Sequence, residues 1–336
     1  MESILLLVHT EADGTLAKPA LEALSAAIAA GGELAVGLVG GAVEPAANLA
    51  ACAGARRILA VTGDAFTQPR YATDAAAAEA LARAAGSAMV LAPATSRWAR
   101  ALPGVAYRLG GRIDTHATGL TLRDGAPAVT RWFYRQRMEA VLTRTARPWF
   151  VLLDPGCVSP WSGAPASGAA AELVAVEAPP SRTTVTGVVA PRADEQTIRP
   201  DAKLLFVAGA GWTKKQPDGA VHVEEAQQLI LGALRGAQAS LGGSKSLVDL
   251  SGEGQAVLPF MTHLNQVGQT GSTPRHPKGL STCCHGEEPH VVGWRFVTER
   301  RAINLDPNCG WSRGKADVVY VADAFAVVRE LNRLLG

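Results

Sequence analysis

Short apolar runs alternate with alanine-rich stretches of helical spacing along the first 95 residues. The apolar runs, which we predict to be strands, are Ile4–Val8, Leu34–Val39, Arg57–Val61 and Met89–Ala92. The stretches between them, which we predict to be helices, are Lys18–Ala30, Glu44–Ala53 and Thr73–Ala85. Strands that are apolar throughout and alternate with helices are typical of a parallel sheet that is covered on both faces.

Between residues 119 and 153 the pattern changes to strands with little helix between them. We predict strands over Leu120–Arg123, Val129–Arg137, Ala140–Thr145 and Trp149–Leu153. They indicate an antiparallel extension of the first sheet. Residues 154–201 are then rich in Pro, Gly, Ser and Ala, which is typical of a boundary between domains. Within this region Val174–Val176 and Val185–Val189 are candidate short strands.

The second half returns to the alternating pattern. We predict strands over Lys203–Ala208, Gly279–Thr282, Arg301–Asn304 and Val318–Val321, and helices over Val223–Leu241 and Ala324–Leu335. The expected fold class is α/β, with two Rossmann-like, doubly wound parallel-sheet domains, the first carrying the antiparallel extension. The expected bounds are 1–190 for the first domain, 191–200 for a linker and 201–336 for the second domain.

Composition excludes several classes of function. The chain of 336 residues has 32 Lys and Arg against 30 Asp and Glu, and only 5% aromatic residues, so we expect no nucleic-acid partner. No apolar run reaches the ~18 residues of a membrane span, and the acidic N-terminus does not resemble a signal peptide. Five scattered Cys residues do not form a disulfide pattern. We therefore expect a cytoplasmic protein that does not span a membrane.

Two glycine-containing stretches follow predicted strands or precede them. Gly209, Ala210, Gly211 and Trp212 come directly after a strand, where backbone N–H groups can cradle a phosphate. Alternatively, these residues form a simple turn at the end of a strand, followed by the solvated pair Lys214–Lys215. The second stretch is Gln266, Val267, Gly268, Gln269, Thr270 and Gly271, which offers backbone amides and a hydroxyl to one ligand or forms an ordinary loop.

Two further stretches carry polar side chains near strand ends. Residues 283–290 contain two Cys and two His, but adjacent cysteines lack the usual spacing of zinc ligands, so we expect no metal site. Ala302–Pro307 is a strand that runs into Asn304 and Asp306, whose side chains either cap a turn or hold a ribose or adenine edge.

These four stretches, in this order, resemble the alpha subunit of electron-transfer flavoprotein. Gln266–Gly271 reproduces the family's Gln-Val-Gly-Gln-Thr-Gly, His290 falls at the family's His, and Ala302–Pro307 matches its Ala-Ile-Asn-x-Asp-Pro. In the first half, Leu91–Thr95 resembles the family's Ala-Pro-Ala-Thr strand end, and Arg131 to Tyr134 its Arg-Pro-Ile-Tyr. The likeness covers most of the chain.

The resemblance implies an electron carrier that binds FAD on the second domain and pairs with a beta subunit, which the first domain contacts. It implies that the Thr270 hydroxyl lies near flavin N5 and His290 faces the flavin C2 carbonyl. Backbone amides of Gly268–Gly271 and Gly286 would meet the pyrophosphate or ribityl chain, and Asn304 and Asp306 the adenosine end. Cys284 and His285 replace residues of the family's cofactor-binding stretch, so they join the candidate cofactor contacts. The partners implied are a donor dehydrogenase, with methylated amines one candidate substrate class, and a quinone oxidoreductase as acceptor.

The sequence also departs from the family. Ala210 stands where the family has an Arg beside the flavin, and Cys283-Cys284-His285 replaces its Gly-Ile-Ser. Loss of the Arg predicts a lower flavin potential unless Lys214, Lys215 or His285 substitutes for it. Two other interpretations stay open: a stand-alone flavin-dependent dehydrogenase, and a non-redox nucleotide-binding structural subunit. An electron-transfer protein is expected rather than an enzyme with its own substrate.

One basic and aromatic stretch lies outside these motifs. Strand alternation over Thr130–Arg137 predicts that Arg131, Arg135 and Arg137 share one face. Such a face indicates a surface for docking a subunit or partner, or a solvated edge strand.

Overall fold

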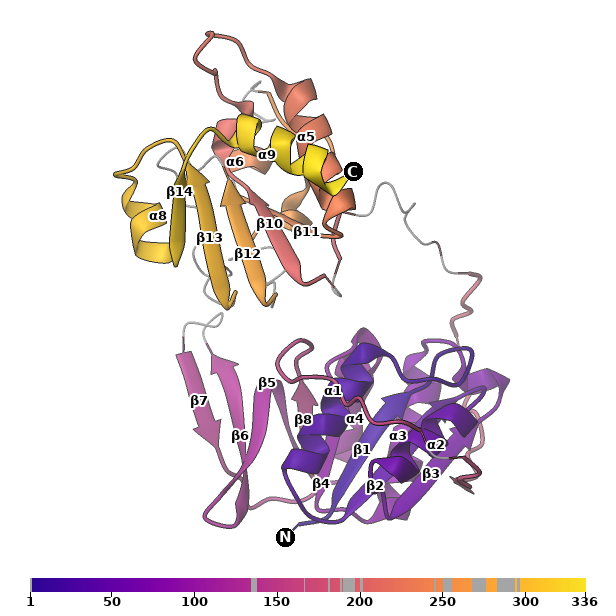
Figure 1. Cartoon of the computed structure of the whole chain (residues 1–336). Helices are drawn as coiled ribbons and strands as arrows, with labels where there is room; N and C mark the ends of the chain where they lie inside the picture. The colour runs from indigo at the N-terminus through magenta and orange to yellow at the C-terminus, as the bar shows by residue number, and fades with distance from the viewer. Residues whose placement is uncertain are drawn as a thin grey trace. The chain divides into compact units, whose positions relative to one another are not determined.

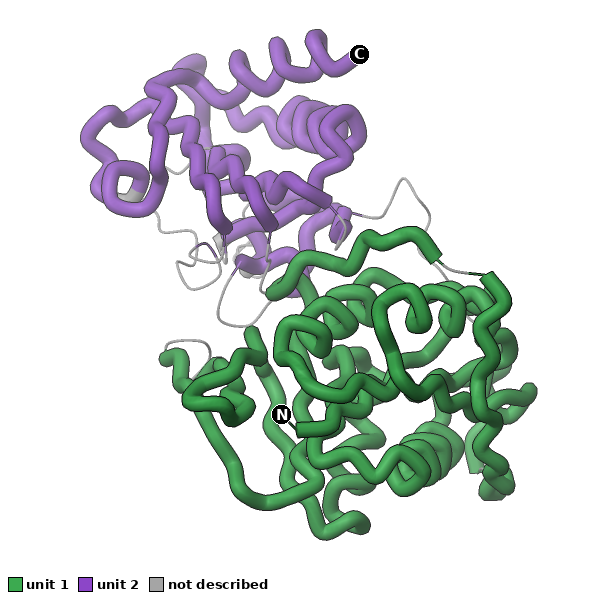
Figure 2. The backbone as a smooth tube through the Cα atoms, turned by 60° about the horizontal axis from the view of Figure 1, so that its bottom comes forward, with its two compact units in different colours: residues 1–188 green, residues 189–336 purple. Residues whose placement is uncertain are grey.

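The computed structural model describes residues 2–133, 138–165, 167–180, 182–187, 189, 197–199, 202–244, 246–249, 256–267, 276–282, 294 and 297–336. The chain divides into two compact units, Met1–Val188 and Val189–Gly336 (Figure 2). Each unit has its own sheet. Most of the predicted linker, 191–200, lies outside the described residues, so its bounds stay a prediction.

The first unit is built on a nine-stranded sheet in the order β7-β6-β5-β8-β4-β1-β2-β3-β9 (Figure 1). Its strands are β1 (Ile4–His9), β2 (Leu34–Gly40), β3 (Arg57–Thr62), β4 (Met89–Pro93), β5 (Arg112–Arg123), β6 (Ala126–Phe133), β7 (Met138–Leu142), β8 (Trp149–Leu153) and β9 (Glu172–Leu173). The pairs β5–β6 and β6–β7 are antiparallel, and the other neighbouring pairs are parallel. The predicted antiparallel extension is confirmed, but β8 returns to the parallel part between β4 and β5.

Helices cover both faces of this sheet. They are α1 (Lys18–Ala29), α2 (Glu44–Cys52), α3 (Tyr71–Ala85) and α4 (Ser96–Arg108), with a 3₁₀ turn η1 (Asp64–Phe66) before α3. Side chains of α1 and α2 join one core cluster, and those of α3 and α4 join a second cluster that faces the other side of the strands. The chain passes from β1 to β2 and β3 in one direction, then crosses to β4 on the other side of β1. This arrangement is the expected doubly wound sheet.

Two local predictions for the first unit differ from the structure. The strand near residue 174 is β9, which covers Glu172–Leu173 instead of Val174–Val176, and the described residues of 185–189 form no strand. Helix α4 was not predicted, because Pro103 interrupts its pattern; it begins where the Thr95 hydroxyl accepts the N–H of Trp98.

The second unit has a five-stranded parallel sheet in the order β11-β10-β12-β13-β14. The strands are β10 (Leu204–Ala208), β11 (Ser240–Gly243), β12 (Lys278–Thr282), β13 (Glu299–Asn304) and β14 (Val318–Val321). The described helices are η2 (Ala210–Thr213), α5 (Val223–Gly236), α6 (Ser246–Asp249), η4 (His263–Asn265), α8 (Gly310–Lys315) and α9 (Ala324–Leu335). Helices α5 and α9 pack on one face, and Val267, Trp294 and Val297 on the other. A second parallel sheet is therefore confirmed.

The predicted helix Val223–Leu241 is too long by five residues. Helix α5 ends at Gly236, because Gln238 takes a left-handed φ of 47° and the N–H of Ala239 returns to the carbonyl of Leu234. Ser240 and Leu241 then enter β11, which pairs with β10.

Candidate functional site

The second sheet reverses its strand order beside β10. The chain passes from β10 to β11 on one side and then to β12 on the other side. In open parallel sheets, ligands bind at the carboxyl ends of the strands next to such a reversal. The described candidate residues gather at this edge: Gly209–Trp212 follow β10, Gln266 pairs with Gly243 at the end of β11, and Asn304 and Asp306 close β13.

The turn after β10 is buried and closely held. Gly209 leads into η2, in which the side chains of Ala210 and Trp212 are 1% and 0% exposed. The indole N–H of Trp212 donates to Thr282 Oγ1 at 2.8 Å, and its ring lies 4.5 Å from that of Phe325 on α9. The Trp212 side chain is therefore part of the core, and only its backbone is left to contribute to a ligand site.

Gln266 and Val267 lie against the end of β11. The N–H of Val267 donates to the carbonyl of Gly243 at 3.1 Å, and both side chains are 1% exposed. A Cβ at Gly242 would lie 2.4 Å from Val267 Cγ2, and one at Gly243 would lie 2.0 Å from Met261 Cε. The two glycines are thus required for the approach of this loop to the sheet.

Asn304 and Asp306 organise the turn after β13. Asn304 is 2% exposed; its Nδ2 donates to Ser312 Oγ at 3.1 Å, and its Oδ1 accepts the N–H of Asp306 at 3.0 Å. Asp306 in turn accepts the N–H of Asn308 at 2.8 Å. Both side chains therefore cap the turn, which is one of the two roles expected for them. Their role in binding a ligand stays a prediction.

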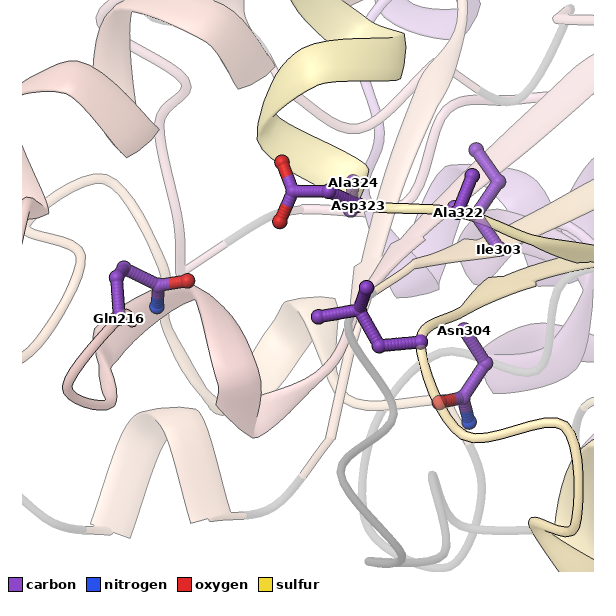
Figure 3. Close-up of a pocket in the computed structure, with 7 residues that line it drawn as sticks. Gln216, Ile303, Asn304, Ala322, Asp323 and Ala324 are labelled. Atoms are coloured by element: carbon purple, nitrogen blue, oxygen red, sulfur yellow. The ribbon is translucent and has the colours of Figure 1, made fainter. Parts of the chain in front are cut away.

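A small hollow lies beside Asn304, where the ends of β13 and β14 meet the segment after η2 (Figure 3). Its lining includes Gln216 and Asp323, neither of which the sequence analysis selected. Gln216 Nε2 donates to the carbonyls of Gly211 and Lys214, and Asp323 Oδ1 caps α9 at the N–H of Ala326. Asp323 was detectable as the helix cap that precedes an apolar-periodic run, whereas no local signal identifies Gln216.

The other candidate residues lie outside the described residues. They are Gly268, Gln269, Thr270, Gly271, Cys284, His285, Gly286 and His290. The roles that the resemblance implies for Thr270 and His290 therefore stay predictions.

In the first unit, a different cluster occupies the carboxyl end of β1. The imidazole of His9 stacks on the indole of Trp98, with ring centroids 3.8 Å apart. Its Nε2 lies 3.3 Å from Asp74 Oδ1, and Arg97 donates to both oxygens of Asp74 at 2.6 and 3.1 Å. Burial lowers the pKa of His9 despite its contact with Asp74, because a buried imidazole is protonated less readily.

The basic stretch in β6 is also accounted for in part. Arg131 is directed onto Asp114, at 3.0 Å, with its side chain 18% exposed, so it is paired rather than displayed on an open face. Arg135 and Arg137 lie outside the described residues, and the docking interpretation stays a prediction.

Two kinds of feature are absent from the part of the chain that the structure describes, a metal site and a membrane span. No group of three or more His, Cys, Asp or Glu side chains there is arranged to hold a metal ion. Within the same residues, no helix has the length and apolar character needed to cross a membrane. Among the described residues, Cys52 and Cys157 take part in no disulfide.

Comparison with known families identifies a matching family. The electron transfer flavoprotein domain family matches residues 4–181, which is more than half of the chain and coincides with the doubly wound sheet of the first unit. A comparison with curated proteins found no match. The chain therefore belongs to the electron transfer flavoprotein domain family.

Proposed function

We propose that this chain is the alpha-type subunit of a heterodimeric electron carrier that holds FAD on its second unit. The family assignment supports an electron-transfer role, and it is the observation that carries the proposal. In this proposal, electrons arrive from a flavin dehydrogenase, with methylated amines one candidate substrate class. They leave toward a quinone oxidoreductase.

The described edge of the second sheet suits a dinucleotide in three respects. It lies beside a strand-order reversal, and it carries the Gly209–Gly211 turn after β10, the strand at that reversal. Polar side chains from separate segments, Gln216, Asn304 and Asp323, surround one hollow at the same edge. The Asn304 amide can donate and accept hydrogen bonds at an adenine edge, and the Asp323 carboxylate can accept them from ribose hydroxyls, which supports the adenosine end of FAD at this place.

The cofactor would supply the redox chemistry, and the protein would supply binding and electrostatics. The residues of the described edge have no catalytic acid–base task in this proposal; they bind and orient. Ala210 brings no charge to the turn after β10, and the first cations along the chain are Lys214 and Lys215. We therefore expect a flavin potential below that of a relative with Arg at this position.

The test is a visible spectrum of the chain purified with a beta-type subunit from the same organism. The proposal predicts one flavin-type spectrum that is bleached by dithionite and by a partner dehydrogenase with its substrate, but not by small substrates alone. Bleaching by a small substrate alone would indicate a stand-alone dehydrogenase. Absence of flavin after co-expression would support a non-redox nucleotide-binding subunit instead.

A further inference from the structure

A short chain of hydrogen bonds ties the ends of β10 and β12, which are neighbours in the sheet of the second unit. Trp212 Nε1 donates to Thr282 Oγ1 at 2.8 Å, and this hydroxyl donates to the carbonyl of Val207 at 3.0 Å. The N–H of Gly209 donates to the carbonyl of Thr282 at 2.8 Å. The residues on both sides of the strand-order reversal are therefore joined by side chain and by backbone.

This link is fully buried. Trp212 and Thr282 are both 0% exposed, so neither group has water as an alternative partner. The Thr282 hydroxyl uses its donor on Val207 and accepts from Trp212, which satisfies both of its roles. A buried pair that is satisfied in this way fixes one geometry, because either group left alone would be unpaired in the core.

The turn after β10 is also held by other contacts. The ring of Trp212 packs on Phe325 of α9, and Gln216 Nε2 donates to the carbonyls of Gly211 and Lys214. The backbone from Gly209 to Lys214 is therefore fixed by β12, by α9 and by its own continuation. Sites that bind a ligand through backbone groups depend on such preorganisation.

We propose that Trp212 and Thr282 are positioning residues for FAD, because their hydrogen bond sets the conformation of the Gly209–Gly211 turn that receives the cofactor. The inference rests on the proposed function. Neither side chain touches the cofactor in this proposal; both act through the backbone of the turn.

The experiment measures FAD affinity and thermal stability of the full heterodimer, stripped of cofactor and titrated with FAD. Trp212→Phe and Thr282→Val each remove one side of the hydrogen bond; Thr282→Val keeps the shape of the side chain, whereas Trp212→Phe also removes part of the ring. Each is expected to weaken FAD binding about threefold to tenfold, in line with one net hydrogen bond. The double variant should bind about as weakly as either single variant. The stabilisation that FAD adds to the melting temperature should shrink in parallel.

Two controls separate positioning from general stability. Thr282→Ser keeps the hydroxyl and should retain wild-type affinity. Trp149→Phe removes a buried indole hydrogen bond in the first unit, where Trp149 Nε1 donates to Asp114 at 2.9 Å. It should lower the melting temperature while FAD affinity stays within twofold of wild type.

The proposal is overturned if Trp212→Phe and Thr282→Val lower the melting temperature of the stripped protein while FAD affinity stays within twofold of wild type. It is also overturned if Thr282→Ser binds FAD as weakly as Thr282→Val, because loss of the hydroxyl would then not explain the weaker binding. A wild-type heterodimer that binds no FAD refutes the proposed function itself, and this inference with it.

Discussion

Asp114 on β5 is the buried acid that joins the antiparallel extension to the rest of the first sheet. Its side chain is 1% exposed and accepts hydrogen bonds from three residues on three different segments. Arg131 on β6 donates at 3.0 Å, Trp149 on β8 donates at 2.9 Å, and Arg144 donates to both carboxylate oxygens. The replacement Asp114→Asn keeps the shape and removes the charge, so it tests this junction directly.

The expected loss in the free energy of unfolding follows from the groups that the replacement leaves without a charged partner. Two guanidinium groups, 18% and 37% exposed, lose the carboxylate that they share, and an amide cannot accept all the hydrogen bonds that the carboxylate accepts. Removing one partner of a buried ion pair costs about 3–5 kcal/mol. For a unit of this size, about 3 kcal/mol corresponds to a fall in melting temperature of roughly 6–12 °C.

Thermal unfolding at neutral pH, followed by tryptophan fluorescence, measures this loss. Arg56→Gln is a matched control, because Arg56 forms an ion pair with Glu33 in which both side chains are more than 60% exposed, and such pairs contribute about 1 kcal/mol or less. The second unit has its own core, so FAD content should be unchanged in both variants. A loss below about 1 kcal/mol for Asp114→Asn would refute the reasoning that this acid holds the extension in place.

The same site has a predictable pH dependence. Burial alone would raise the pKa of Asp114, but the hydrogen bonds from Arg144 and Trp149 hold its pKa below the ordinary range. A carboxyl group with a lowered pKa stabilises the fold above its ordinary pKa, and this contribution is lost as the pH falls through the lowered value. The difference in the free energy of unfolding between wild type and Asp114→Asn should therefore become smaller in strong acid.

Three further outcomes follow from other described residues. Trp98 is 0% exposed and its indole N–H has no partner among the described residues, so Trp98→Ala should cost about 3–5 kcal/mol and Trp98→Phe less than about 1.5 kcal/mol in denaturant unfolding. Because the pKa of His9 lies below about 6.5 in the folded protein, the unfolded chain binds the proton more readily, and stability should fall as the pH drops below 6.5. His9→Phe should remove that slope, and an unchanged slope would exclude His9 as its source. Asp323→Ala should cost about 1 kcal/mol as α9 loses its cap, while Asp323→Asn retains the cap; equal melting temperatures for the two would contradict this.

The strands of the first unit were predictable because they are buried on both faces. Ile4–Val8, for example, is 0–2% exposed throughout, so every position is apolar and the run is clear in the sequence. Helix α4 was missed for the opposite reason, since Pro103 lies within it and Arg97 and Arg100 break the apolar pattern. Pro103 is tolerated in the structure because a buried face of Trp98, Leu102 and Val105 holds the helix on the sheet.

Strand β11 shows what local sequence cannot reveal. Ser240–Gly243 contains two glycines and no β-branched residue, and it is a strand because it pairs with β10 along its length. The glycines are there for contacts with residues 18 to 25 positions later in the chain, Met261 and Val267. Likewise, the strand ends that carry the candidate site could be predicted, whereas the inward orientation of Trp212 depends on Thr282 and Phe325, which are distant in sequence.

The strand order reverses in the same way in the two units, but the residues beside the reversal differ. In the first unit, the end of β1 is filled by the protein itself: His9 stacks on Trp98, and Arg97 neutralises Asp74. In the second unit, the end of β10 is a turn of Gly209, Ala210 and Gly211, and its one large side chain, Trp212, is turned away into the core. Large side chains that fill such an edge leave a dinucleotide no place, whereas small residues let the backbone approach it. The contrast supports the proposal that the second unit binds the cofactor.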